Sequence, residues 1–408
     1  MALKYITDES FKTLAKDKRV LARFDFNVPM EKSDESKIAD TTRVDEAIPT
    51  IQAILDSGVK KLILMSHFGR PKGKVDKKYS LLPVAEYLAQ KLGMDVTLTE
   101  TALDRGIKTL LTLNDTKIIL LENLRFHPEE EANDREFARL LSTYGDVFVF
   151  DAFGAAHRKH ASTYEINAFF KNRAFGGLLL KKELESLDKI VKDPKKPFVA
   201  IVGGAKVSDK IKIIESLLID VDKLLIGGAM AYPFLKAKGA TVGKSLCSDE
   251  DVALARRILG MPSKNKIVLP TDHVASLTFG GEPVDVASVG IDGDLIGLDI
   301  GASTAQNYAD HLRSAKTVLW NGPMGLFENK LYAKGTLSIA KALADLSGKA
   351  FTLVGGGDSV NAVKQSGLAD KMSHISTGGG ASLEYIENGS LPGIQALKFG
   401  VENYAGIE

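Results

Sequence analysis

The first 180 residues alternate between apolar runs and segments with apolar side chains at helical spacing. The apolar runs begin stretches at residues 20–29, 61–71, 117–128 and 146–158, and each of these stretches finishes in polar side chains. Helical spacing occupies residues 46–55, 82–92 and 136–144. Such alternation predicts a parallel sheet with helices on both faces.

The second half repeats this plan, but its strands end on glycine. Strands are predicted at residues 198–202, 223–226, 317–320, 351–354 and 374–376, and residues 266–269 are a further strand that ends at a proline. Residues 178–191 have the spacing of one helix, and Pro194 and Pro197 stop it. The prediction is an α/β protein with two doubly wound parallel-sheet (Rossmann-like) domains joined by a helical hinge. We expect the domains at residues 1–180 and 198–396, with the interdomain helix and hinge at 181–197.

Composition narrows the class of protein. A chain of 408 residues with 44% hydrophobic content is long enough for two domains. A net charge of +1 argues against nucleic-acid and membrane-surface binding, so any anion site must be local. One cysteine, no apolar run near 18 residues and no leader pattern at the start indicate a cytoplasmic protein.

The strand ends of the first half gather cationic and polar side chains. Ligands of parallel sheets bind beyond the carboxyl ends of the strands. The groups expected there are Asp25, Asn27, His67, Arg70, Asn123, Arg125, His157 and Arg158, and Arg43 joins them from the start of a helix. One such arginine is usually a surface residue, but the repetition favours a small, multiply anionic ligand. A metal site at His67, His157 and His160 is disfavoured because its surroundings are too cationic.

The glycine-ended strands of the second half favour a nucleotide. Gly203-Gly204 follows a predicted strand and precedes a helical pattern. Lys206 and Lys210 lie between the two glycines and the first apolar residues of that pattern. Paired glycines let the backbone approach phosphates, and helix N-termini favour anions. Asp358 follows three glycines, where its carboxylate could hold magnesium. A plain strand-to-helix turn with two solvated lysines is the alternative for the first motif taken alone.

Two other nucleotide motifs fail on spacing. The glycines in Gly239-Ala-Thr-Val-Gly-Lys-Ser245 are four residues apart, whereas a P-loop needs five. A dinucleotide fingerprint that starts at Gly355 has Val360 in place of its third glycine, which weakens a nicotinamide dehydrogenase.

Eight motifs, in order between residues 20 and 382, closely resemble those of phosphoglycerate kinase. They are Arg23-Phe-Asp-Phe-Asn-Val-Pro29, Ser66-His-Phe-Gly-Arg-Pro71, Leu121-Glu-Asn-Leu-Arg125, Asp151-Ala-Phe-Gly-Ala-Ala-His-Arg158, Gly203-Gly-Ala-Lys-Val-Ser-Asp-Lys210, Trp320-Asn-Gly-Pro-Met-Gly325, Gly355-Gly-Gly-Asp358 and Thr377-Gly-Gly-Gly-Ala-Ser382. The resemblance implies reversible phosphoryl transfer between 1,3-bisphosphoglycerate and ADP, which gives 3-phosphoglycerate and ATP in glycolysis. It also implies a magnesium-bound nucleotide, a monomer, and return of residues 397–408 to the first domain.

The resemblance assigns roles to individual residues. The acid would be bound by Asp25, Asn27, Arg43, His67, Phe68, Gly69, Arg70, Arg125 and Arg158. The transferred phosphoryl group would meet Lys206, Arg43 and the amides of Gly378, Gly379 and Gly380. The nucleotide would be bound by Lys210, Gly227, Gly228, Asn321, Pro323, Glu328, Gly356, Gly357, Asp358 and Ser359, with Asp358 on magnesium, Glu328 on the ribose, and Gly227, Gly228, Asn321 and Pro323 on the adenine side.

Three positions depart from the family pattern. Phe150 stands where a polar residue is expected, Phe68 replaces a leucine, and Asp272-His273 replaces an apolar pair. None of these changes removes a charged group from the expected site. Phe150 leaves open how the backbone before Asp151 is held.

Phosphoryl transfer from an acyl phosphate needs no enzyme nucleophile. It needs in-line positioning and a cationic field, here supplied from both halves by Arg43 and Lys206, so the two domains are expected to close over the reactants and exclude water. A nucleotide-binding regulatory protein without activity is one alternative, and the presence of Lys206, Asp358 and Arg43 argues against it. A dehydrogenase of acidic metabolites is the other.

Overall fold

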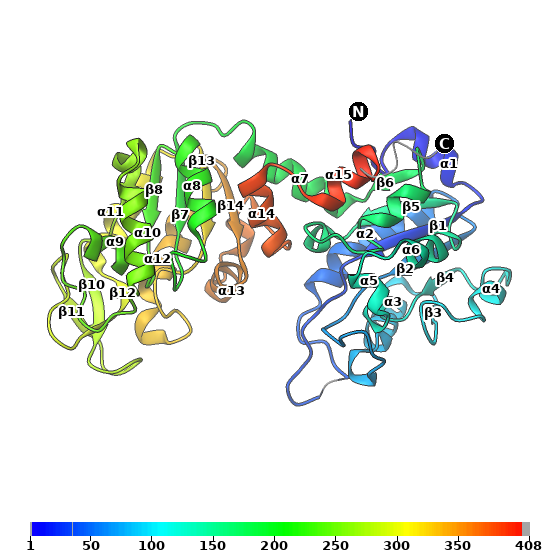
Figure 1. Cartoon of the computed structure of the whole chain (residues 1–408), viewed down its shortest axis with the longest axis horizontal. Helices are drawn as coiled ribbons and strands as arrows, with labels where there is room; N and C mark the ends of the chain where they lie inside the picture. The colour runs from blue at the N-terminus through cyan, green and yellow to red at the C-terminus, as the bar shows by residue number, and fades with distance from the viewer. Residues whose placement is uncertain (1, 35, 402–408) are drawn as a thin grey trace. The chain divides into compact units, whose positions relative to one another are not determined.

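The computed structural model describes residues 2–34 and 36–401, and the chain divides into two compact units (Figure 1). The first unit runs to Leu184 and resumes at Ser390, and the second comprises Glu185–Gly389. Of the C-terminal peptide expected in the first domain, residues 402–408 lie outside the described residues.

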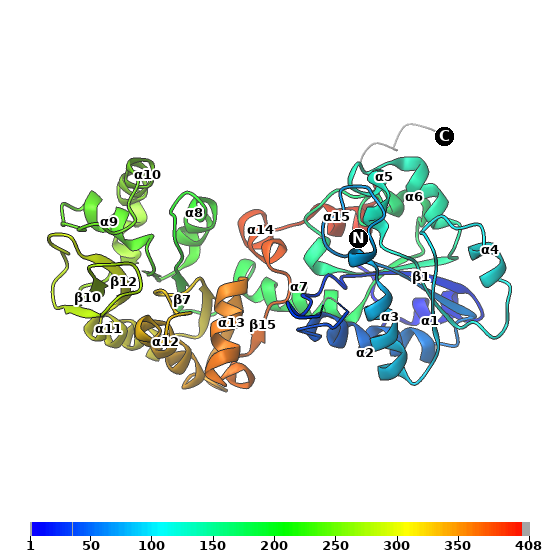
Figure 2. The same ribbon diagram turned by 90° about the horizontal axis from the view of Figure 1, so that it is seen from below.

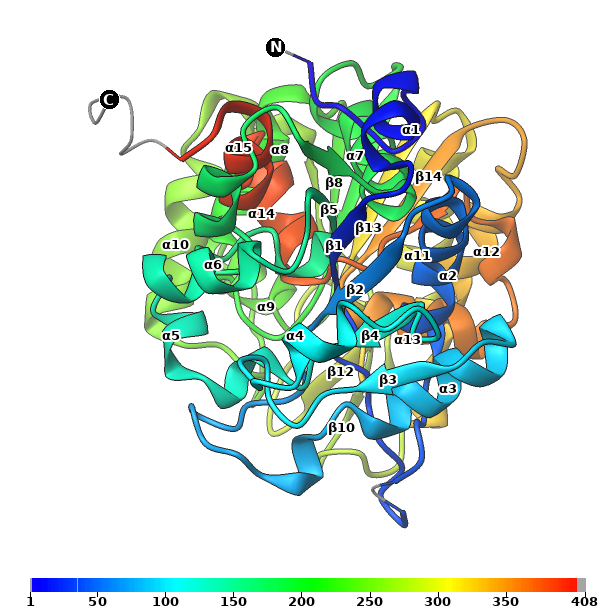
Figure 3. The same ribbon diagram turned by 90° about the vertical axis from the view of Figure 1, so that its right-hand side faces the viewer.

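The first unit is built on a six-stranded parallel sheet with the strand order β3-β4-β2-β1-β5-β6. Figure 3 shows β1, β2, β4 and β3 one beside the next. The strand bounds are β1 Arg19–Phe24, β2 Lys61–Met65, β3 Val96–Leu98, β4 Ile118–Leu120, β5 Val147–Asp151 and β6 Ala174–Gly176. Since all strands are parallel, their carboxyl ends meet at one edge of the sheet.

Helices cover both faces of this sheet. One face packs against α1, α2 and α3, whose apolar residues join Val20, Ala22 and Phe24 of β1 in one core. The other face carries Phe148, whose ring stacks on Phe170 with 5.4 Å between centroids. The helices of this unit are α1 Glu9–Ala15, α2 Thr42–Asp56, α3 Leu82–Leu92, α4 Ile107–Leu110, α5 Pro128–Glu131, α6 Arg135–Ser142 and α15 Pro392–Phe399, with 3-10 turns η1 Lys77–Tyr79, η2 Leu124–Phe126, η3 Phe153–Ala155 and η4 Glu165–Phe169.

The second unit contains another six-stranded parallel sheet, with the order β15-β14-β13-β7-β8-β9. Its strands are β7 Phe198–Val202, β8 Lys223–Ile226, β9 Ile267–Val268, β13 Thr317–Asn321, β14 Phe351–Gly355 and β15 His374–Ile375. Trp320 lies fully buried on the central strand β13. The helices are α8 Ile211–Asp220, α9 Ala231–Ala237, α10 Asp249–Leu259, α11 Ala302–Arg313, α12 Lys334–Ala344, α13 Gly357–Ser366 and α14 Gly380–Asn388, with 3-10 turns η5 Pro262–Lys266, η6 Lys330–Tyr332 and η7 Ala369–Lys371. Helix α7, Leu178–Val191, crosses the boundary between the units in the sequence.

The second unit also holds a small antiparallel sheet that the sequence did not predict. Its order is β11-β10-β12, with bounds β10 His273–Ser276, β11 Val284–Val286 and β12 Ile296–Ile300. It lies beside α9 in Figures 1 and 2, and Tyr232 of α9 shares a small apolar cluster with Val242 and Ile291.

The predicted fold class is confirmed, since both main sheets are parallel and covered by helices. The helices expected at 82–92 and 178–191 have the predicted bounds. Within the described residues, no helix combines the length and the apolar character needed to cross a bilayer.

Candidate active site

Arg43 ties the start of α2 to the end of β1. Its Nη1 donates to Asp25 Oδ2 at 3.1 Å and to the carbonyl oxygen of Asn27 at 3.1 Å. The Arg43 side chain is one-third exposed, whereas the Asp25 side chain is nearly buried. One end of Arg43 is therefore fixed by the strand end, and the rest of the fork can still reach a ligand.

The strand end of β2 is held to its neighbours by amide side chains. The Gly69 N–H donates to Asn27 Oδ1 at 2.9 Å, and the Phe68 N–H donates to Asn123 Oδ1 at 3.1 Å. Gly69 has a φ of +60°, and a Cβ atom there would lie 2.3 Å from the Tyr79 ring. Glycine is therefore required where the chain turns between β2 and Arg70.

Arg125 is a buried cation at the end of β4. Its Nη1 donates to the Gly69 carbonyl at 2.7 Å, and its Nε lies 3.4 Å from Glu131 Oε1. Burial lowers its pKa, the Glu131 carboxylate raises it, and Arg158 lowers it. Only 3% of its side chain is exposed, so an anion at this edge would meet a guanidinium that is already in place.

His67 lies among the arginines of this edge. Burial, followed by the charges of Arg23, Arg125, Arg158 and Arg43, holds its pKa well below the ordinary value. Arg158 is itself oriented by a neighbour, since its Nε donates to His157 Nε2 at 3.2 Å. The residues expected at the acid thus gather at one edge, and Arg70 is exposed there.

In the second unit, the glycine pairs Gly203-Gly204 and Gly227-Gly228 lie close together at the ends of β7 and β8. Gly228 has a φ of +68°, and a Cβ atom there would lie 2.6 Å from the Gly204 nitrogen. The Gly203 N–H donates to the Asn321 carbonyl, and the Gly228 N–H donates to the Met324 carbonyl, both at 2.9 Å. Side chains are excluded here, so a ligand would meet bare backbone.

Asn321 organises the strand ends at the centre of this sheet. Its Nδ2 donates to the Gly355 carbonyl at 2.8 Å, and its Oδ1 accepts from Lys210 Nζ. Burial lowers the pKa of Lys210, and the Asp358 carboxylate raises it. Asn321 is expected on the adenine side, and its side chain contacts Lys210 and Gly355.

Helix α13 begins directly after these glycines. The Gly322 N–H donates to Ser359 Oγ at 2.5 Å, and Gly356, with a φ of +89°, precedes the first turn at Gly357. Asp358 is exposed in that turn, and no other described residue forms a hydrogen bond or ion pair with its carboxylate. Its oxygens fit magnesium, which takes one or two protein carboxylates and completes its shell with water and phosphate.

The remaining expected residues have fewer contacts. Gly378 donates its N–H to Ser376 Oγ at 3.2 Å, and Gly379 and Gly380 begin α14. Lys206 and Glu328 are exposed, and within the described part of the chain no hydrogen bond or ion pair joins either side chain to another residue.

Two buried residues at the first edge were not predicted as site residues. Arg23 is 1% exposed on β1, and Glu130 is fully buried in α5. The sequence signal for Arg23 was a charge within an apolar strand run. Glu130 stands among three consecutive glutamates, and nothing in that run distinguishes the buried one.

The departure at Phe150 has a simple explanation in the sheet. Phe150 pairs with Arg23 of β1 and with Gly176 of β6, and its carbonyl accepts the Gly177 N–H at 3.0 Å. Strand pairing therefore holds the backbone before Asp151, and the fully buried phenyl ring needs no polar partner.

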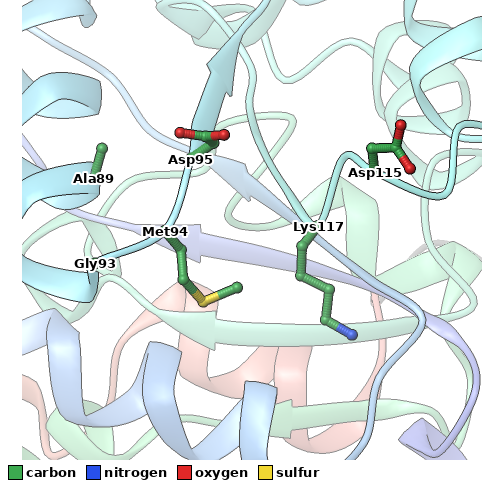
Figure 4. A pocket seen from close by; sticks show the side chains of 6 residues that line it. All are labelled: Ala89, Gly93, Met94, Asp95, Asp115 and Lys117. Atoms are coloured by element: carbon green, nitrogen blue, oxygen red, sulfur yellow. The ribbon is translucent and has the colours of Figure 1, made fainter.

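A pocket of about 400 Å³ lies elsewhere in the first unit (Figure 4). Its lining residues are Ala89, Gly93, Met94, Asp95, Asp115 and Lys117. Asp95 and Lys117 precede β3 and β4, so this pocket is at the amino ends of the strands, opposite the edge that carries the arginines.

Comparisons with known proteins agree with the strand-end geometry. The phosphoglycerate kinase family model matches residues 11–389. The phosphoglycerate kinase of Anaeromyxobacter sp. (strain Fw109-5) is 50% identical over 392 residues, covering 93% of this chain and 96% of the relative. That of Chlorobaculum tepidum is 48% identical, with 93% and 96% covered. The solved phosphoglycerate kinase from Coxiella burnetii matches with a TM-score of 0.84 and 37% identity, covering 94% of this chain and 97% of that one.

Proposed function

The chain belongs to the phosphoglycerate kinase family, and from this premise we propose how its residues carry out the reaction. The enzyme transfers a phosphoryl group reversibly between 1,3-bisphosphoglycerate and ADP, which gives 3-phosphoglycerate and ATP. The observation that carries this proposal is the pair of strand-end sites, one with arginines and one with glycines, in separate units of one chain.

The acid is bound at the arginine-rich edge of the first unit. Arg125 and Arg158 hold its static anionic groups, while Arg43 serves the phosphoryl group in transit. The contact of Arg43 with Asp25 and the packing of Arg125 against Gly69 support this assignment, because a pre-positioned guanidinium loses little freedom when it binds an anion.

The nucleotide is bound at the glycine-ended strands of the second unit. The first turn of α13 meets the phosphates, and Asp358 holds the magnesium ion that neutralises their charge. The bonds from Asn321 to Lys210 and Gly355 support a place for Asn321 beside the phosphates instead of the adenine. Glu328 binds the ribose.

Transfer proceeds in line, without a covalent enzyme intermediate. The bond between phosphorus and the carboxyl oxygen breaks as a terminal phosphate oxygen of ADP forms the new bond, and the carboxylate leaves as 3-phosphoglycerate. Lys206, Arg43 and the amides of Gly378 to Gly380 stabilise the equatorial oxygens. These groups come from both units, so the units close before transfer and exclude water.

The direct test mixes the purified protein with ATP, magnesium and 3-phosphoglycerate and follows ADP. We expect turnover that needs all three components. A folded sample without turnover that still binds nucleotide would instead support the regulatory alternative.

A further inference from the structure

Arg23 lies between His67 and a buried serine in the sheet of the first unit. Its Nη2 is 3.1 Å from His67 Nδ1, and its Nε donates to Ser162 Oγ at 2.8 Å. We propose that Arg23 is a positioning residue that locks His67 as the neutral ring tautomer with its proton on Nε2. The consequence for the acid rests on the proposed function.

The tautomer follows from the donors that meet at this contact. A guanidinium carries only N–H donors and stays protonated. Nδ1 of His67 must therefore supply the lone pair, because a proton on Nδ1 would face another donor. The ring keeps its proton on Nε2, and an imidazolium, protonated on both nitrogens, is excluded by the same geometry.

Glu130 holds Arg23 from the opposite side through Ser162. The Ser162 hydroxyl donates to Glu130 Oε1 at 2.5 Å, and the Ser162 N–H donates to Oε2 at 3.0 Å. With its proton directed at the carboxylate, the hydroxyl has lone pairs left for the Nε of Arg23. In this series of hydrogen bonds, Arg23 donates to Ser162 and Ser162 donates to Glu130. The buried guanidinium and the buried carboxylate compensate each other's charge.

The other charges around His67 act on its charge and not on its tautomer. Arg125, Arg158 and Arg43 disfavour a positive ring, as does burial. His160 provides the comparison, since burial and then Arg125, Arg23 and Arg158 lower its pKa to about 3. Within the described residues, however, no arginine contacts the ring of His160 at hydrogen-bond distance. Among the residues that the structure describes, only the contact with Arg23 distinguishes the two nitrogens of His67.

The lock matters for binding because the charged groups of the acid, its carboxylate and its phosphate, offer only acceptors. Carboxylate and phosphate oxygens need a donor, and the locked ring presents Nε2–H. Since the ring is neutral, this donor persists across neutral pH without an added positive charge.

The test measures which ring nitrogen of His67 carries the proton in the whole, unliganded protein. Histidine labelled with ¹⁵N is observed by long-range nitrogen–proton correlation, and His67→Gln assigns the His67 signals among the seven histidines. We expect the Nε2–H tautomer of His67 between pH 6 and 8. A proton on Nδ1, an even mixture or a charged ring in the wild type would overturn the proposal.

Two variants distinguish the effect of the contact between Arg23 and His67 from the effect of the more distant charge of Glu130. Arg23→Met with Glu130→Gln removes the lock without leaving one buried charge unpaired, whereas Glu130→Gln alone keeps the contact with His67. The double variant should show mixed tautomers and a KM for 3-phosphoglycerate raised on the order of tenfold, with an unchanged KM for ATP. The single variant should keep the wild-type tautomer.

An unchanged tautomer in the double variant would show that Arg23 does not set it. If the double variant fails to fold, the wild-type spectrum still decides the question. Absence of turnover in the wild type would refute the proposed function and leave the tautomer result standing.

Discussion

Lys206 and Lys210 are four residues apart, but their ammonium groups have different surroundings. Lys210 is half-buried and bonded to Asn321, so its charge is fixed beside the strand ends. Lys206 is exposed in the loop between β7 and α8. A fixed cation suits a group that stays in place, whereas an exposed side chain can follow a phosphoryl group between two positions.

Lys206→Ala should therefore lower kcat by on the order of 10² or more, because it removes a donor that acts mainly in the transition state. The Kd for ADP should change little, and the exposed Lys212→Ala on α8 is the control. Steady-state kinetics and equilibrium binding measure the two quantities. Weakened ADP binding with a normal kcat would assign Lys206 to ground-state binding.

Single residues were predictable from the sequence where their chemistry is local. Arginine after a strand and glycine before a helix indicate an anion site, and Arg125 and Gly356 lie at such strand ends. Which partner each side chain chooses was not predictable, because it depends on strand order. Asn321 meets Lys210 only because β13 lies beside β7 in the sheet.

Elements with strong periodicity were predicted with nearly correct bounds, and weak ones were missed. The strands of the antiparallel sheet are three to five residues long, and β11 is mostly exposed, so neither alternation nor an apolar run marks it. The strand expected at 266–269 is only Ile267–Val268. Such strands are stabilised by pairing with segments that are distant in the sequence, and no local pattern predicts that pairing.

Helix α15 packs against the loop that carries Arg158. The Gly393 N–H donates to the Ala156 carbonyl at 2.8 Å, and a Cβ atom at Gly393 would lie 3.0 Å from that oxygen and 3.3 Å from the Thr163 carbonyl. Both carbonyls flank the loop that carries Arg158. A side chain at Gly393 must therefore displace this loop or α15.

Gly393→Val should raise the KM for 3-phosphoglycerate by on the order of tenfold, because it moves Arg158 without removing it. The KM for ATP should stay near the wild-type value, since the residues proposed to bind the nucleotide belong to the other unit. The exposed Gln395→Ala on the same helix is the control. Equal increases in both KM values would show that the effect is not confined to the acid site.

Asp299 caps α12 from the end of β12. It accepts the Gly335 N–H at 2.8 Å and the Ile300 N–H at 2.9 Å. Burial raises its pKa to about 7 and outweighs both hydrogen bonds, which lower it. The folded protein therefore favours the protonated carboxyl, and the stability this provides is present below pH 4 and lost as the pH rises through 7.

Asp299→Asn keeps an acceptor oxygen and cannot ionise. Its free energy of unfolding, relative to the wild type, should therefore improve as the pH rises from 4 to 8. Denaturant unfolding followed by the fluorescence of Trp320, the one tryptophan, reports on the second unit. The exposed Asp310→Asn should not show this trend, and a pH-independent difference for Asp299→Asn would contradict the argument.

At the scale of the whole molecule, α7 links the two units in the chain. Its start is held by the first sheet, because the Leu180 N–H donates to Asp151 Oδ1 at 2.8 Å and the Gly177 N–H donates to the Phe150 carbonyl. Both acceptors end β5, the strand that leads to Arg158. The strand that leads to Arg158 therefore also holds the start of the connecting helix.

Closure should depend on both ligands together. A ligand shifts an open–closed equilibrium only by its different affinity for the two states, and each ligand alone contacts the groups of one unit. With both anions bound, the cationic groups of the two units gain partners, and their repulsion no longer opposes approach. Small-angle scattering should show the largest fall in the radius of gyration with magnesium-ADP and 3-phosphoglycerate together.

Arg158→Ala serves as the matched control for this experiment, because it weakens the acid site in one unit and leaves the nucleotide site intact. At an acid concentration that saturates only the wild type, the variant should show just the change produced by nucleotide alone. An unliganded wild type as compact as its ternary complex would refute ligand-driven closure. Water would then have to be kept from the phosphoryl group by some means other than approach of the two units.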